Sequence, residues 1–200
     1  MSELDSLMHA IRNRRSMGVA RLKPDPVPKE LVLTALEAAN WAPSHGETEP
    51  WRFTVYTGEG RRGLGEAFAE AYRLDAEREG SFKESSFEGQ RKRVEASPVW
   101  ISLGLEPALR PDGSLKMGLE EEGLALSGAV QNLHLVANAQ GLAGMWLSQG
   151  VMVHPHVAAF VGLDAPHSRL FGFFVLGWPN IPWPEGERRP LEEKLCWVES

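Results

Sequence analysis

Apolar residues recur along the chain at spacings that predict helices alternating with strands. Those between residues 4 and 11 follow the i, i+3, i+4, i+7 spacing of an amphipathic helix. We expect this helix to run into the basic segment at residues 14–16 and to end near Gly18. A second helix begins at Pro28 and ends before Pro43, because proline disfavours helical geometry in the residue before it.

Four later segments have the apolar patterns of strands. Residues 51–57 alternate between apolar and polar positions, as a half-buried strand does. Residues 98–105 are apolar on both faces, which favours a buried strand. Residues 142–147 and 170–177 are predicted to form two more strands. A short helix is expected around residues 156–161, between the last two strands.

Two segments break this alternation. A glycine-rich turn at residues 58–63 leads into a helix, and the charged stretch at residues 73–97 predicts a mobile flap over a site. The longest helix, residues 120–140, is apolar nearly all round, which indicates burial on most sides and suits a subunit interface.

The end of the chain differs in composition from the rest. Four prolines follow Trp178, and the apolar residues at 195–198 come after them. This pattern predicts an extended arm over residues 178–200 that ends in a short strand. Neither a repeat nor a linker between two cores is visible, so residues 1–200 are expected to form a single domain.

Composition and charge exclude several classes of protein. The formal net charge of −6 argues against a nucleic-acid partner. The single cysteine, Cys196, excludes an intramolecular disulfide and a cysteine-based zinc site. The longest apolar run, residues 170–178, is far shorter than the roughly 20 residues of a membrane-spanning helix. The polar, amphipathic N-terminus is unlike a signal peptide, so we expect a cytoplasmic protein without a membrane partner.

The glycine-rich turn at residues 58–63 matches the G-x-G-x-x-G pattern of dinucleotide-binding folds. It lies between a predicted strand and a helix, which suits a Rossmann-type dehydrogenase. However, the next strand begins only at Pro98, and Glu59 would place a carboxylate inside the phosphate turn. A plain turn from strand to helix is therefore favoured, and the dehydrogenase is kept as an alternative.

The segment at residues 12–16 offers a second way to bind an anion. Its three arginines and Ser16 have the donors to bind a phosphate, or they complement the dipole at the end of a helix. Arg188 and Arg189 in the tail also have two interpretations: they contact a phosphate, or they are a solvated pair. His154 and His156 lack the partners of a metal site or a hydrolase triad, so no metal is expected.

Taken together, five segments resemble the FMN-dependent nitroreductase family, most closely its small members. They are RRS at residues 14–16, APSH at 42–45 with PWRF at 50–53, the helix and turn at 128–144, LGWP at 176–179, and RRPLEE at 188–193. Their order matches the family over some 180 residues of the chain. The resemblance implies an α+β fold of three layers, α/β/α, with a central mixed sheet. It also implies a homodimer that exchanges its C-terminal arms and holds FMN at the interface.

The resemblance further assigns roles to residues. Arg14, Arg15 and Ser16 would contact the phosphate and ribityl chain of FMN, and Arg188 or Arg189 would also contact the phosphate. Trp41 and His45 would face the flavin across the dimer interface. Met145, Trp146 and Leu147 would lie along the isoalloxazine. Close relatives have arginine where this chain has Leu147, so a tail arginine is expected to replace that donor. Glu49 stands where the family has glutamine, and we expect it to point away from the flavin or to be protonated.

The activity implied by this resemblance is electron transfer from NADH or NADPH to a small acceptor by a ping-pong mechanism. A nitroaromatic compound or a quinone is the expected acceptor. No catalytic side chain is expected, because the flavin itself supplies the redox chemistry. The alternative in another class is a flavin-binding sensor or storage protein without turnover.

Overall fold

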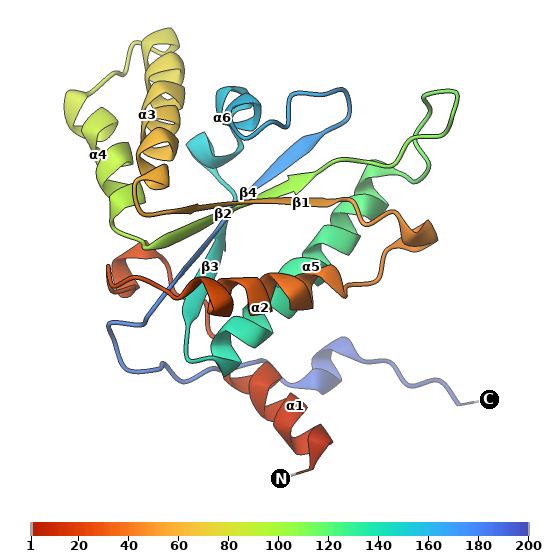
Figure 1. Cartoon of the computed structure of the whole chain (residues 1–200). Helices are drawn as coiled ribbons and strands as arrows, with labels where there is room; N and C mark the ends of the chain where they lie inside the picture. Colours follow the sequence, from red (N-terminus) through yellow and green to blue (C-terminus); the bar gives the residue numbers. More distant parts are fainter. Residues whose placement is uncertain (1, 200) are drawn as a thin grey trace.

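The structure, a computed structural model, describes residues 2–199 as a four-stranded sheet between two layers of helices (Figure 1). The helices are α1 (Glu3–Asn13), α2 (Lys29–Asn40), α3 (Gly60–Arg78), α4 (Glu84–Glu95), α5 (Leu119–Ala139) and α6 (Pro155–Phe160). The strands are β1 (Trp51–Thr57), β2 (Val99–Leu105), β3 (Ala143–Leu147) and β4 (Arg169–Gly177). These elements confirm the expected α+β class with three layers.

The sheet has the order β1-β2-β4-β3, and all three strand pairs are antiparallel. The expectation of a mixed sheet was therefore wrong for residues 2–199, where the one parallel pairing is the isolated bridge between Ser16 and Gly144. The sheet also excludes the Rossmann alternative, because β1 pairs antiparallel with β2 where a dinucleotide fold needs parallel strands.

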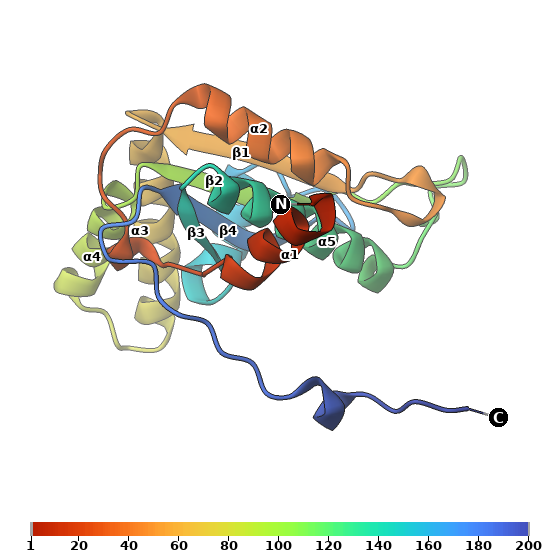
Figure 2. The ribbon, with the colours of Figure 1, turned by 90° about the horizontal axis from the view of Figure 1, so that it is seen from below.

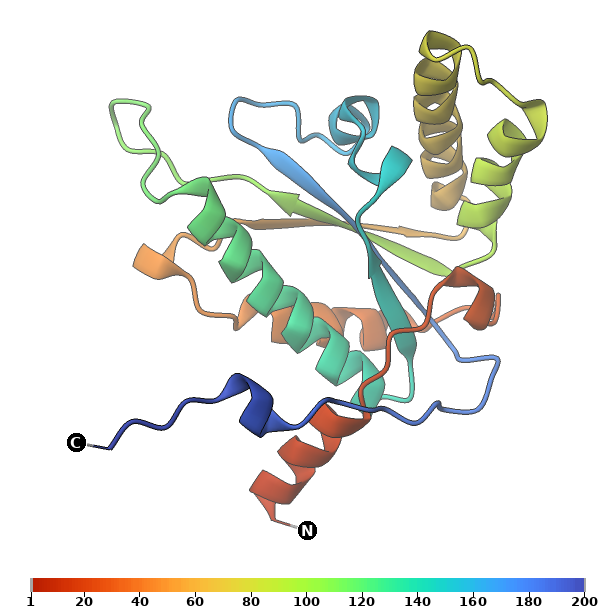
Figure 3. The same cartoon turned by 180° about the vertical axis from the view of Figure 1, so that it is seen from behind.

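The strand β2 lies in the middle of the sheet and is buried at every position. Its side chains alternate between two cores, as the geometry of a strand requires. Ile101 and Leu103 pack with residues of α2 and α5 on one face. The view from behind shows these two helices lying over one face of the sheet (Figure 3). Trp100 packs on the other face against Phe68 of α3 and Phe173 of β4. The two-sided apolar pattern predicted this strand correctly.

The charged segment that we expected to be a mobile flap is a pair of packed helices, α3 and α4. Its charges form ion pairs, such as Arg91 with Glu66 at 2.7 Å and Arg73 with Glu70 at 2.5 Å. Beneath them Phe68 and Val94 are completely buried. The charges therefore cover the outer face of an amphipathic helical pair, and the density of charge alone misled the prediction.

The first helix ends earlier than expected. A capping box formed by Ser2 and Asp5 begins α1, which ends at Asn13 and contributes no buried residue. The chain then straightens because Met17 N donates a hydrogen bond to Gly144 O of β3 at 2.9 Å. The pairing with β3 thus replaces the last turn of the predicted helix.

The C-terminal tail leaves the body of the protein, as the view from below shows (Figure 2). It is irregular except for the single turn Leu191–Lys194, and the predicted strand at residues 195–198 does not form within the described chain. The tail keeps its apolar side chains in solvent, with Trp197 76% exposed. Within residues 2–199, the structure has neither a helix long and apolar enough to cross a membrane nor three His, Cys, Asp or Glu side chains grouped for a metal.

Candidate functional site

The basic segment after α1 lies beside β3 and the end of α5. Ser16 forms its bridge with Gly144, and Arg15 N donates a hydrogen bond to Asn138 Oδ1 of α5 at 3.0 Å. The segment is therefore held on two sides by backbone and side-chain contacts. These contacts bring Arg14, Arg15 and Ser16 next to the strand β3, which carries Met145, Trp146 and Leu147.

One edge of the Arg14 guanidinium is fixed and the other is open. Its Nη1 donates to His134 Nδ1 at 3.2 Å and to Ser16 Oγ at 3.3 Å. Within residues 2–199, its Nε and Nη2 have no hydrogen-bond partner. Burial lowers the pKa of Arg14, and the nearby charges of Arg188 and Arg15 lower it further. Arg14 therefore offers a free pair of donors in a setting that lacks a negative charge.

Arg15 has a different geometry. Its Nε donates to Pro184 O at 2.9 Å, and its Nη1 donates to the carbonyls of Arg12 and Arg14 at 2.7 and 2.8 Å. The guanidinium also lies against Gly186, where a side chain would have no room. Arg15 thus ties the start of the chain to the tail and adds positive charge, while Arg14 keeps the open donors.

The arginines of this cluster have no acidic partner. In the described chain, Arg14, Arg15 and Arg188 form no salt bridge, whereas Arg73 and Arg91 on the other side of the sheet each pair with two carboxylates. The charge of Arg188 lowers the pKa of Arg14, so this tail residue lies near enough to act on the cluster. For Arg189, the structure shows only that its carbonyl accepts a hydrogen bond from Lys194 Nζ. Such an uncompensated cluster is suited to an anion.

A cavity of about 560 Å³ lies beside β3. It is lined by Met145, Trp146 and Leu147 together with Arg93, Ser148, Gln149, Gly150 and Met152. Trp146 Nε1 donates to Phe171 O at 2.7 Å, and Leu147 is buried in the core against α3 and β4. Met145 and Leu147 belong to the core on one face of the sheet and Trp146 to the core on the other face. Arg93 of α4 also lines the cavity and was not identified by the sequence analysis.

His45 lies far from this cluster within one chain. His45 Nδ1 pairs with Glu121 Oε1 at 2.5 Å near the start of α5, whereas Arg14 contacts His134. Thirteen residues of helix separate the two positions, which corresponds to roughly 20 Å at 1.5 Å per residue. Trp41 is 79% exposed at the end of α2. One chain alone does not bring His45 to the arginines.

The loop that carries His45 has a strained backbone. Gly46, Glu47 and Glu49 have φ angles of 68°, 54° and 44°, a region that disfavours residues other than glycine. Glu49 is exposed, and its N donates to Ser44 Oγ at 3.1 Å. Strain of this kind in a residue other than glycine concentrates at functional sites.

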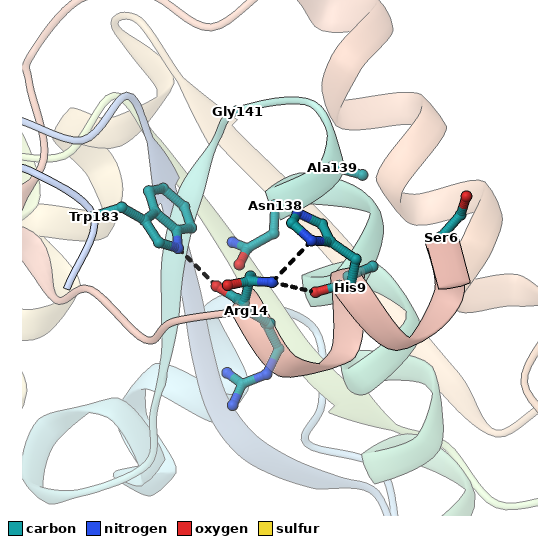
Figure 4. A pocket seen from close by; sticks show the side chains of 9 residues that line it. Ser6, His9, Arg14, Asn138, Ala139, Gly141 and Trp183 are labelled. Carbon is teal, nitrogen blue, oxygen red and sulfur yellow. Dashed lines mark hydrogen bonds between the residues drawn. The ribbon is translucent and has the colours of Figure 1, made fainter. Parts of the chain in front are cut away.

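A second cavity, of about 510 Å³, lies between α1, the end of α5 and Trp183 of the tail (Figure 4). Trp183 Nε1 donates to Asn13 O at 2.6 Å, which holds the tail against the end of α1. The Arg14 guanidinium points away from Trp183 in this view. Arg14 is one of the residues that line this cavity, so the cavity adjoins the arginine cluster.

Two residues of α5 complete the site and were missed in the sequence. Asn138 orients the backbone at Arg15, and His134, only 5% exposed, contacts both Arg14 and the Arg15 carbonyl. Burial lowers the pKa of His134 to about 4, and the positive charge of Arg14 lowers it too. The sequence signal that could have identified His134 is its position as a single histidine among apolar residues of a predicted helix.

This low pKa predicts a pH-dependent stability. Between the ordinary value of 6.5 and about 4, the unfolded chain binds a proton at His134 that the folded chain does not. The contribution of His134 to the free energy of unfolding is thus complete above about pH 6.5 and is lost as the pH falls toward 4. We expect urea unfolding at fixed protein concentration to show this decline, and His134→Leu to reduce it. An equal slope in both proteins would contradict the assignment.

Comparison with known proteins identifies the family. The model described as the nitroreductase family matches residues 11–178. YfhC of Bacillus subtilis (strain 168), a candidate NAD(P)H nitroreductase, is 27% identical over 190 residues, which cover 94% of this chain and 92% of the relative. A nitroreductase-like family protein from Bacillus cereus is 28% identical, with a TM-score of 0.78 over 100% of both chains.

The structure of a third relative contains a bound ligand. This candidate nitroreductase from Desulfovibrio desulfuricans was solved in complex with FMN; it is 25% identical and has a TM-score of 0.70 over 97% of both chains. The similarity thus extends over nearly the whole chain in both sequence and fold. Because the family model alone spans most of its length, this protein belongs to the nitroreductase family.

Proposed function

We propose that this protein is an FMN-dependent oxidoreductase that passes electrons from NADH or NADPH to a small acceptor, a nitroaromatic compound or a quinone. The observation that carries the proposal is the arginine cluster beside β3, which has positive charge, open donors on Arg14 and no carboxylate. Membership of the nitroreductase family and the FMN-bound relative support the same cofactor.

The residues present fit the phosphate of FMN. Nε and Nη2 of Arg14 form a planar pair of donors, the geometry that binds two phosphate oxygens at once. Arg188 contributes a second guanidinium from the tail, and Ser16 lies within 3.3 Å of Arg14 Nη1. Leu147 is part of the core, so the tail arginine takes the role of the donor that related sequences carry at that position.

The cavity beside β3 fits the flat part of the cofactor. Met145, Trp146 and Leu147 line the cavity along β3, and Arg93 adds a cation to its lining. FMN bound here would supply the redox chemistry between the nicotinamide and the acceptor. The protein excludes water and orients the ring, and no side chain has to act as an acid or a base.

The second half of the site comes from a second copy of the chain. Trp41 is 79% exposed and Leu124 of α5 is 73% exposed, while α1 has no buried residue at all. Apolar surface of this extent is unfavourable in a monomer. We therefore propose a homodimer, in which the arm covers the partner and Trp41 with His45 face the partner's flavin. We also propose that the enzyme works in the cytoplasm.

The proposal is tested by the absorbance of the purified protein. FMN bound at about one per chain gives a band near 450 nm, a general property of oxidised flavins, and anaerobic NADPH or NADH should bleach it. Addition of a nitroaromatic or a quinone should then restore the band, with turnover in the steady state. A protein that binds no flavin would refute the proposal, and a flavoprotein that NAD(P)H does not reduce would be the sensor or storage protein instead.

A further inference from the structure

His134 is a buried polar side chain whose place in the protein the proposed function does not explain. Its ring packs edge-on against Phe174, with the ring centroids 5.0 Å apart. The other groups that face it are the Arg14 guanidinium and the carbonyls of Arg15 and Gly144. A histidine in such a position has to satisfy both ring nitrogens within the protein.

The partners of the two ring nitrogens determine the protonation state. A guanidinium only donates hydrogen bonds, so Nδ1, at 3.2 Å from Arg14 Nη1, has to be the unprotonated acceptor. A carbonyl only accepts, so Nε2, at 3.0 Å from Arg15 O, carries the proton. His134 is therefore neutral in this arrangement and connects the side chain of Arg14 to the backbone of Arg15.

We propose that His134 is a positioning residue that sets the Arg14 guanidinium for the phosphate, an inference that rests on the proposed placement of FMN. By accepting from Nη1, the imidazole fixes the rotation of the guanidinium and leaves Nε and Nη2 open. The bond to Arg15 O holds the backbone that carries both arginines. A neutral acceptor also stabilises Arg14 at a place where Arg15 and Arg188 repel it.

The experiment compares FMN with riboflavin, which has the same ring system but no phosphate. His134→Leu removes the acceptor and should weaken FMN binding roughly 3- to 10-fold, the loss expected for one hydrogen bond. Riboflavin binding should change less than about 2-fold. His134→Gln can present an oxygen to Arg14 and should recover part of the affinity for FMN. The matched control is His156→Leu, which replaces an exposed histidine on α6 and should change neither ligand.

A double-mutant cycle with Arg14→Ala separates the possible failures. Once Arg14 is absent, His134→Leu should have no further effect on the ratio of FMN to riboflavin affinity. An effect that persists without Arg14, or an equal loss of both ligands in His134→Leu, would overturn the positioning role while leaving the phosphate site in place. An unchanged ratio in Arg14→Ala itself would instead refute the proposed phosphate site. Circular dichroism and thermal unfolding of each apoprotein show whether a variant has failed to fold.

Discussion

Replacing Arg14 with alanine is expected to weaken FMN binding by roughly 10- to 150-fold, which corresponds to about 1.5–3 kcal/mol for a charge-assisted hydrogen bond. The reason is the open edge of its guanidinium, which no group of residues 2–199 neutralises. Riboflavin should bind almost as before, because it lacks the phosphate. Fluorescence quenching titrations of both ligands measure the two dissociation constants.

The same titration distinguishes the tail arginines. Arg188→Ala should weaken FMN binding in the same direction, because the charge of Arg188 acts at Arg14 in this structure. Arg189→Ala is expected to have the smaller effect, since no contact places Arg189 at the cluster. Normal FMN binding in both variants would mean that the tail is purely structural here.

The negative control for these variants is Arg62→Ala, in the turn at the start of α3. This turn matches the glycine-rich pattern, yet it packs next to the charged α4, and Arg61 donates to the carbonyls of Glu95 and Ser97. Neither FMN nor riboflavin affinity should change. If this variant alone lost FMN, the phosphate would bind at the glycine-rich turn and our placement would be wrong.

Removing the last eleven residues is expected to convert the dimer into monomers. A chain that ends at Arg189 keeps Trp183, Pro184 and Arg188, but it loses four exposed apolar side chains, Leu191, Leu195, Trp197 and Val198. Burying a side chain of this size contributes about 1.5–3 kcal/mol, so the dimer should weaken at least ~100-fold. Flavin should be lost with it, because Trp41 and His45 of the partner then no longer cover the ring.

Analytical ultracentrifugation and the flavin absorbance check this prediction together. The full chain should sediment at twice its mass of 22.1 kDa with flavin bound, and the shortened chain at about one chain mass without it. A deletion from residue 180 should be more severe, because it also removes the contacts of Asn180 and Trp183 with the body, and we expect it to lose solubility. A shortened chain that remains a flavin-loaded dimer would show that the arm is dispensable.

Much of the architecture was predictable because it follows from local patterns. The two-sided apolar run at residues 98–105 predicted the central strand, and the small apolar residues of 120–140 predicted α5 to within one residue at each end. Proline at position 43 ended the preceding helix as expected. The role of residues 14–16 at the FMN phosphate, which the resemblance to the family implied, stays a prediction.

The failures occurred where a long-range contact decides the local structure. Residues 73–97 were judged by charge alone, whereas the burial of Val94 against α3 turns the segment into a helix. The end of α1 depends on the pairing of Met17 with Gly144, more than a hundred residues away. The pairing of β1 with β2 and the antiparallel sheet were also not predicted, because the order of strands depends on contacts between distant segments.

The sequence by itself determined most of the elements and the family, because helical and strand periodicity and short motifs are properties of neighbouring residues. Only the tertiary structure decided which arginine is open. Arg14 and Arg15 are adjacent and chemically alike, but Pro184 of the tail binds one and His134 of α5 fixes the other. That difference arises from residues more than a hundred positions away, which the fold alone brings together.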